Sequence, residues 1–128
     1  MILGIGVDTI EIERFTSWHT YSQKKLQRIF SVEEIDYCLS QKNKSAERFA
    51  VRFAAREALY KALSYAYPHN NLPFLTLCAH ITIKKQDQRP HIVLRNITHG
   101  IDVDSLVIHL SWSHSHTHAT AFVVLEHK

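Results

Sequence analysis

The sequence predicts an α+β domain in which helices pack on a mainly antiparallel sheet. Residues 44 to 67 read KSAERFAVRFAAREALYKALSYAY, a stretch without Gly or Pro in which Ala, Leu, Arg and Glu favour helix. From residue 79 onward, short runs of alternating apolar and polar residues are separated by polar turns, a pattern typical of strands. Helices and strands that are segregated along the chain in this way favour an α+β architecture.

The first half of the chain predicts one strand and several helices. The apolar run from Ile2 to Val7 predicts a buried strand that ends at Asp8, and residues 9 to 29 are expected to be helical with a break near Thr20. Ser31 and Glu34 have the spacing of a capping box, which predicts a helix from there to about Ser40. After the long helix, Pro68 ends the helical pattern.

The second half predicts a meander of strands. Residues 79 to 85 and 91 to 95 are expected to be strands joined by a turn at 86 to 89, and residues 96 to 104 hold a short helix or a loop. Residues 105 to 113 and 119 to 126 then predict a final antiparallel pair.

Composition limits the class of protein. The 128 residues suffice for one domain, and 45% apolar content argues against disorder. No run of 18 apolar residues exists and the first residues lack the pattern of a signal peptide, so we expect a cytoplasmic protein that does not span a membrane. In that setting Cys38 and Cys78 are expected to be reduced thiols in the core.

Positive charge is concentrated in the first half of the chain. The net charge is +3, and the stretch from Arg14 to Phe30 holds four basic residues and no acidic one. Such a patch suits an acidic partner or is simply a solvated surface, and the sequence leaves both open. We find no nucleic-acid-binding motif, so nucleic acid is not the expected partner. The four candidates for docking are Arg14, Lys24, Lys25 and Arg28.

Glu57 lies on the apolar stripe of the long helix. Phe49, Phe53 and Tyr60 recur at helical spacing, and Glu57 falls between the last two of them. A carboxylate at the edge of an apolar face requires a compensating cation. Lys61, one turn further on, can supply it, and so can a divalent metal ion.

Asp8 directly follows the first predicted strand. An aspartate in that place is held rigidly enough to bind a metal, and it is equally suited to cap the helix expected after it. Asp8 and Glu57 together could hold a hard cation such as Mg²⁺, which commonly takes one or two carboxylates together with water and substrate phosphates.

Three segments give the chain a family resemblance. GIGVDTIEIERF (4 to 15), RFAAREALYKAL (52 to 63) and LSWSHSHTHATAFVVLE (110 to 126) resemble the three motifs of the holo-acyl-carrier-protein synthase family, the small type of 4′-phosphopantetheinyl transferase. The motifs occur in the family's order and reach from one end of the chain to the other. The resemblance implies the 4′-phosphopantetheinyl transferase fold, a single domain over residues 1 to 128, and a homotrimer with active sites between subunits.

The resemblance also implies an activity. Members of this family transfer 4′-phosphopantetheine from coenzyme A to a serine of an acidic acyl carrier protein in fatty-acid biosynthesis, and they release adenosine 3′,5′-bisphosphate. Coenzyme A is therefore the expected co-substrate and Mg²⁺ the expected cofactor. Phosphoryl transfer of this kind depends on positioning and on neutralising charge on the phosphate oxygens.

Residue roles follow from the same motifs. The resemblance implies that Asp8 and Glu57 bind Mg²⁺, that Lys61 holds a phosphate, and that Ser113 and His114 contact the 3′-phosphate or a neighbouring part of coenzyme A. Arg52 either reaches the phosphates or lies on a solvated helix face, and the solvated face is favoured for an Arg. His114 is a candidate general base, ranked below a water held by the metal or by Glu57, and the sequence does not decide among them.

The chain departs from the family pattern at three places. Arg56 stands where the family usually has Lys, the loop SYAYPHNNLPF lacks the family's glycines, and the turn near residues 86 to 90 lacks one as well. We expect activity to survive because none of these places coincides with Asp8, Glu57, Lys61 or His114. Backbone cradling of the cofactor by that loop is in doubt.

Other interpretations stay open. His114, His116 and His118 alternate and could bind Zn²⁺, although adventitious affinity is favoured over a functional zinc site. The alternatives to a fatty-acid enzyme are a non-catalytic module that docks an acidic partner, a metal sensor built on these histidines, and a transferase acting on carrier domains of polyketide or peptide synthases.

Overall fold

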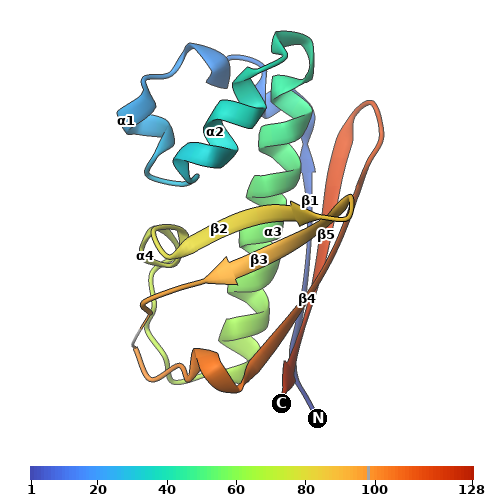
Figure 1. Ribbon diagram of the computed structural model, residues 1–128. Coiled ribbons are helices and arrows are strands. Elements are labelled where there is room, and N and C mark those ends of the chain that lie inside the picture. Colours follow the sequence, from blue (N-terminus) through green and yellow to red (C-terminus); the bar gives the residue numbers. More distant parts are fainter. Residues whose placement is uncertain (98) are drawn as a thin grey trace.

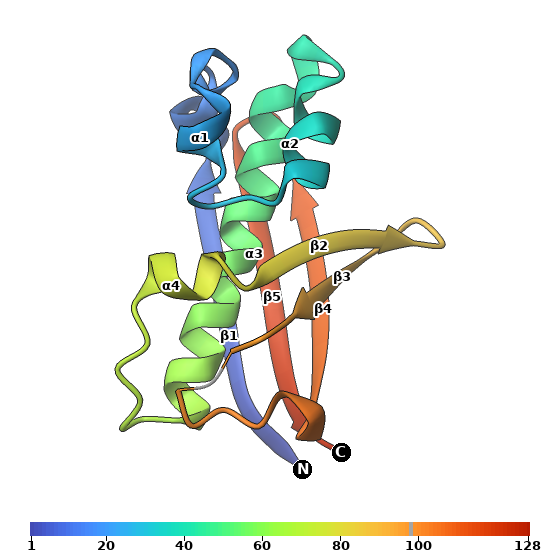
Figure 2. The same ribbon diagram turned by 60° about the vertical axis from the view of Figure 1, so that its left-hand side comes forward.

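The structure is a computed structural model that describes residues 1–97 and 99–128 of the chain. Helix α3 (Ser45–Ala66) runs through the middle of the molecule. A three-stranded sheet covers one side of it, and the β2–β3 hairpin crosses its other side (Figures 1 and 2). The predicted α+β architecture is confirmed.

The strands form two antiparallel sheets and not the one that the sequence suggested. The larger sheet has the order β1-β5-β4 and the smaller one pairs β2 with β3. Their bounds are β1 Ile2–Glu11, β2 Ile81–Gln86, β3 Arg89–Leu94, β4 Leu106–His114 and β5 His118–His127. The remaining elements are η1 Ile12–Phe15, η2 Trp18–Thr20, α1 Gln23–Leu26, α2 Val32–Leu39, η3 Lys42–Lys44, α4 Phe74–Cys78 and η4 Val103–Ser105.

Strand β1 and helix α3 approach each other at two glycines. A Cβ atom on Gly6 would overlap the backbone carbonyl oxygen of Ala58, and one on Gly4 would overlap that of Ala62. Both alanines are fully buried. The glycines that interrupt the first apolar run are therefore required by the close contact between strand and helix.

The two faces of the β1-β5-β4 sheet differ. Gly4, Gly6, Asp8 and Ile10 of β1 face α3, whereas Ile5 and Val7 lie on the opposite face and are 52% and 53% exposed. Phe122 of β5 is on that same face and is 43% exposed. We call this surface, made of Ile5, Val7, Val107, Phe122 and Val124, the outer sheet face.

The prediction for residues 8 to 29 is largely wrong. β1 continues through Asp8 to Glu11, so Asp8 lies inside a strand and caps no helix. The extension is stabilised by pairing with β5, including a hydrogen bond from the Ile12 amide to the Thr117 carbonyl (2.9 Å). The expected long helix is replaced by η1, η2 and the single turn α1.

Other predicted elements agree with the structure. Ser31 and Glu34 form the capping box of α2, the long helix matches α3, and β4 and β5 pair as expected. β3 begins two residues earlier than predicted, and the turn before it places Asp87 and Gln88 at φ of 52° and 67°. That left-handed region favours glycine, which explains why a glycine is usual there.

The loop prediction for residues 96 to 104 includes Thr98, which lies outside the described residues. The described part contains η4, and α4 was not predicted from the sequence. Cys38 and Cys78 are buried free thiols, as predicted, and burial raises their pKa values to about 12 and about 11. No helix among the described residues has the length and apolarity needed to cross a membrane.

Candidate active site

Asp8, Glu57 and Lys61 come together where β1 crosses α3. The Asp8 side chain points toward α3 and is 17% exposed, while Lys61 is 52% exposed. Lys61 Nζ donates to Asp8 Oδ1 (3.2 Å) and to the backbone carbonyl of Val7 (3.0 Å). The sequence expectation that these residues share one site is consistent with this geometry.

Glu57 is half-buried and carries a perturbed carboxyl group. Burial raises the pKa of Glu57, and the negative charge of Asp8 raises it further, while Lys61 and Arg14 offset part of this effect. Two carboxylates therefore face each other with incomplete compensation. Their oxygen atoms are the donor set that Mg²⁺ prefers, and Mg²⁺ needs no more than two carboxylates from the protein when water and phosphates complete its shell.

The expected docking residues are all exposed, and Arg14 adjoins the carboxylate pair. Arg14 lies at the end of η1, close enough to Glu57 to lower its pKa. Lys24 and Lys25 in α1, and Arg28 just after it, are all exposed. Lys25 Nζ lies 3.9 Å from the centre of the Tyr21 ring, which holds it at the surface.

A second charged cluster is buried on another face of α3. Arg52 is 4% exposed, Arg56 is 0% exposed, and both contact Glu34 of α2, which is 2% exposed. Arg56 donates to both carboxylate oxygens of Glu34, with Nη1 at 3.0 Å from Oε2 and Nη2 at 2.6 Å from Oε1. The favoured expectation that Arg52 lies on a solvated helix face is wrong, because α2 and the β2–β3 hairpin cover this part of α3.

Arg52 borders a positively charged pocket of about 180 Å³. Its guanidinium carbon lies 4.9 Å from the centre of the Tyr37 ring and 5.2 Å from that of Trp112, so two aromatic rings hold it. His114 also borders the pocket and pairs through Nδ1 with Glu47 Oε2 (3.3 Å). Lys44, Arg48 and Lys85 add positive charge to the lining.

The pKa of Tyr37 shows the effect of the positive charges around this pocket. Burial by itself would raise the pKa of its phenol, but a hydrogen bond from Lys85 and the positive charges of Lys85, Arg48 and Arg52 lower that pKa overall. Lys85 Nζ lies 3.4 Å from the phenol oxygen. The pocket therefore stabilises negative charge.

Ser113 and the histidines of the last hairpin are placed differently. Ser113 neighbours His114 on β4, so its side chain points to the opposite face and does not line this pocket. His116 and His118 are exposed, and the His118 ring bonds to Thr117 Oγ1 (2.9 Å). No group of three His, Cys, Asp or Glu side chains in residues 1–97 and 99–128 could hold a metal ion, which gives the proposed zinc cluster no support.

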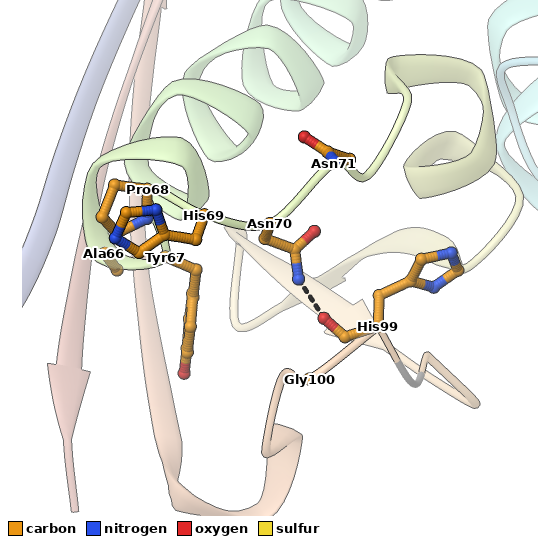
Figure 3. A pocket seen from close by; sticks show the side chains of 8 residues that line it. All are labelled: Ala66, Tyr67, Pro68, His69, Asn70, Asn71, His99 and Gly100. Atoms are coloured by element: carbon orange, nitrogen blue, oxygen red, sulfur yellow. Dashed lines mark hydrogen bonds between the residues drawn. The ribbon is translucent and has the colours of Figure 1, made fainter.

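The loop after α3 forms a hollow of about 510 Å³ where the resemblance implies glycines. Figure 3 shows the Asn70 amide reaching across this hollow to the backbone carbonyl of His99, and Asn70 Oδ1 also accepts from the Leu72 amide (2.9 Å). Helix α3 continues through Ser64 to Ala66 before the loop begins. An asparagine side chain thus organises a loop that the family builds from glycine, and no expected site residue lines the hollow.

A family model described as the 4′-phosphopantetheinyl transferase superfamily matches residues 4–123. The chain belongs to this superfamily. A curated member, the holo-[acyl-carrier-protein] synthase of Treponema denticola, is 36% identical over 132 residues, which cover 98% of this chain and 99% of the relative.

Solved structures of superfamily members agree with the fold. The holo-(acyl-carrier-protein) synthase of Bacillus anthracis, in complex with CoA (3′,5′-ADP), is 30% identical with a TM-score of 0.77 and covers 100% of this chain and 99% of its own. The Helicobacter pylori holo-[acyl-carrier-protein] synthase in complex with coenzyme A is 30% identical with a TM-score of 0.70, over 95% of this chain and 99% of its own.

Sequence reasoning missed Glu34, the buried partner of Arg52 and Arg56. It also did not assign Tyr37, Arg48 and Lys85 to the charged pocket that they line. Glu34 was assigned only to the capping box, although Arg52 and Arg56 have the four-residue spacing that places two cations on one helix face. That spacing alone does not show whether the shared face is buried or exposed.

Proposed function

We propose that this chain transfers 4′-phosphopantetheine from coenzyme A to a serine of an apo acyl carrier protein, in fatty-acid biosynthesis, and releases adenosine 3′,5′-bisphosphate. The observation that supports the proposal is the presence of two oppositely charged clusters on α3. One has an excess of carboxylate beside an exposed lysine, and the other has an excess of guanidinium beside a pocket. A donor with a pyrophosphate and a separate phosphate needs both.

The reaction forms one bond and breaks one. The serine oxygen bonds to the β-phosphorus of coenzyme A, the pyrophosphate P–O bond breaks, and adenosine 3′,5′-bisphosphate leaves with the electron pair. The serine proton passes to a water held by Glu57, and that water passes a proton on to the Glu57 carboxylate. Lys61 turns from Asp8 to a pyrophosphate oxygen, which its 52% exposure permits.

Asp8 and Glu57 are the residues that would hold Mg²⁺. When bound there, the ion supplies Lewis-acid stabilisation of the pyrophosphate oxygens. In its absence Lys61 and Arg14 are the counter-charges nearest to the two carboxylates.

The positively charged pocket is assigned to the 3′-phosphate of the donor. Arg52 is 4% exposed and borders the pocket together with His114. Its Nε lies 3.7 Å from Glu34 Oε2 and has no hydrogen-bond partner among the described residues. A buried cation with an unused donor is stabilised by an incoming phosphate. Ser113 is directed to the other face of β4 and is proposed to contact the donor only across a subunit interface.

A homotrimer with sites between subunits would join the two clusters. Arg52 and Glu57 are five residues apart, which separates their directions by about 140° around the helix. One donor therefore meets them most readily from two different copies of the chain. The outer sheet face, with Ile5, Val7 and Phe122 exposed, is an apolar surface of the kind that a second copy covers.

The acidic carrier is proposed to dock on Arg14, Lys24, Lys25 and Arg28. These side chains are exposed, and Arg14 adjoins Glu57. Charge complementarity of this kind mainly raises the rate of association. The carrier serine would then arrive beside the carboxylate pair.

Mass spectrometry of apo carrier protein tests the proposal. Incubation with the chain, coenzyme A and Mg²⁺ should add one phosphopantetheine to the carrier. Sedimentation of the chain and of Val7→Glu, which puts a charge on the outer sheet face, tests the assembly. If fatty-acid carrier stays unmodified but polyketide or peptide carrier domains react, the partner is wrong; if no carrier reacts, the transferase function is wrong.

A further inference from the structure

Glu34 is the only acidic side chain in direct contact with either buried guanidinium among the described residues. Its Oε1 accepts from Arg56 Nη2 (2.6 Å) and from the Ile83 amide (3.1 Å), and Oε2 accepts from Arg56 Nη1 (3.0 Å). This one carboxylate therefore ties together α2, α3 and β2. Bidentate pairing with a guanidinium fixes the planes of both groups.

The cluster leaves one positive charge uncompensated. Glu34 supplies one negative charge, while Arg52 and Arg56 supply two positive charges, and all three side chains are at least nine-tenths buried. The Nε atoms of Arg52 and Arg56 have no hydrogen-bond partner among the described residues. A buried charge without a counter-charge is costly, so the cluster is more stable when an anion is bound nearby.

Of the two arginines, Arg52 is the one that can meet an anion in the pocket. Arg56 is fully enclosed and its Nη1 also donates to the Arg52 carbonyl (3.3 Å), whereas Arg52 borders the pocket. Arg52 Nε lies 3.7 Å from Glu34 Oε2, and Arg52 Nη1 donates to the Arg48 carbonyl (3.1 Å). Glu34 thus restricts the position of the Arg52 guanidinium, although Glu34 itself does not contact a ligand bound in the pocket.

We propose that Glu34 is a positioning residue for phosphate recognition: its carboxylate lies against Arg52 and holds that guanidinium against the 3′-phosphate of the donor. The inference rests on the proposed function for the identity of that phosphate. It assigns to Glu34 and Arg56 no contact with substrate. It explains why a fully buried ion pair lies under the pocket, where an apolar pair would serve stability equally well.

The experiment measures binding of adenosine 3′,5′-bisphosphate and adenosine 5′-monophosphate by calorimetry to the full chain. These nucleotides differ only in the 3′-phosphate. We expect the unmodified chain to prefer the bisphosphate, and Arg52→Met to reduce that preference on the order of tenfold to a hundredfold, as loss of a charge-assisted contact does.

Glu34→Asp keeps the charge but withdraws it by one methylene, so it should fold and still lower the preference by about tenfold. The double variant with Arg52→Met should be no worse than Arg52→Met alone, since both act on one contact. Arg56→Lys, which keeps the counter-charge, should retain most of the preference. Asp36→Asn, an exposed carboxylate on the same helix, is the matched control and should change nothing.

An unchanged preference in Glu34→Asp, or effects that add in the double variant, would overturn the proposal. So would equal weakening of both nucleotides, because that is what a merely structural role produces. The assay involves no carrier protein and no transfer. A failure of the transferase function would appear in mass spectrometry, whereas a failure of this inference appears in the ratio of the two binding constants.

Discussion

The carboxylate pair and the guanidinium cluster occupy different faces of the same stretch of α3, yet they are built in opposite ways. Asp8, Glu57 and Lys61 are partly open to solvent and carry a surplus of negative charge. Glu34, Arg52 and Arg56 are buried and carry a surplus of positive charge. The difference shows that one helix can hold a site for a cation and a site for an anion when other elements bury one of its faces and leave another partly open.

The largest effect on stability is expected from breaking the buried pair. Glu34→Gln leaves two buried guanidinium groups without a counter-charge, which should lower the free energy of unfolding by about 3–5 kcal/mol. Urea denaturation measures this change. Asp36→Asn on the same helix should stay within about 0.5 kcal/mol of the unmodified chain. If both variants changed the free energy of unfolding equally, Glu34 would not stabilise the buried arginines.

The largest effect on activity is expected at the carboxylate pair. Asp8→Ala and Glu57→Ala should each lower the transfer rate by roughly 100-fold to 1000-fold, as loss of one preorganised electrostatic group commonly does. The rate of holo carrier formation at saturating Mg²⁺ measures this. Glu11→Ala, an exposed residue at the end of the same strand, is the control. Full activity in Asp8→Ala would show that the carboxylate pair is not needed for the transfer reaction.

The carboxylate pair should also give the chain a distinctive pH dependence. The pKa of Glu57 is raised above its ordinary value of 4.5 in the folded state, chiefly by burial. Above pH 4.5 the unfolded chain therefore loses a proton that the folded chain keeps, so without Mg²⁺ the contribution of Glu57 to stability falls as pH rises through the folded pKa.

Thermal unfolding of the unmodified chain and of Glu57→Gln, compared across this range, isolates that contribution. Glu57→Gln should lack the decline because it has no proton to lose. Mg²⁺ should remove the decline as well, since it favours the ionised carboxylate. If the stability of both proteins changed with pH in the same way, burial would not perturb the pKa of Glu57.

The smallest effect is expected from the exposed partner of the carboxylate pair. Lys61→Met removes an ion pair in which the lysine is 52% exposed, so the free energy of unfolding should change by less than about 1 kcal/mol. Its effect on transfer should be far larger. A loss of stability comparable to that of Glu34→Gln would contradict the contrast between the two clusters.

Much of the carboxylate site could be predicted from the sequence. Glu57 and Lys61 are one turn apart on a helix whose composition is unambiguous, and the apolar run before Asp8 marks a rigid strand. The end of that strand could not be predicted, because pairing with residues 118 to 126 decides it and a local pattern does not record such a distant contact.

The guanidinium cluster could not be predicted for a related reason. Arg52 and Arg56 are ordinary residues for an exposed helix face, and their partner lies on another helix at position 34. The Ser31–Glu34 spacing had a sufficient local explanation in the capping box, which the structure also contains. Glu34 performs both tasks, and local patterns reveal only the first.

The contact of Gly6 with Ala58 has a consequence for how this sequence tolerates change. Asp8 is two residues from Gly6, and Glu57 is next to Ala58, so the spacing between the two carboxylates depends on a contact that contains no functional group. Adding a single methyl group at Gly6 would push the strand from the helix and widen that spacing. Selection for the chemistry at residues 8 and 57 would thus be recorded in the sequence as the absence of a side chain at residue 6.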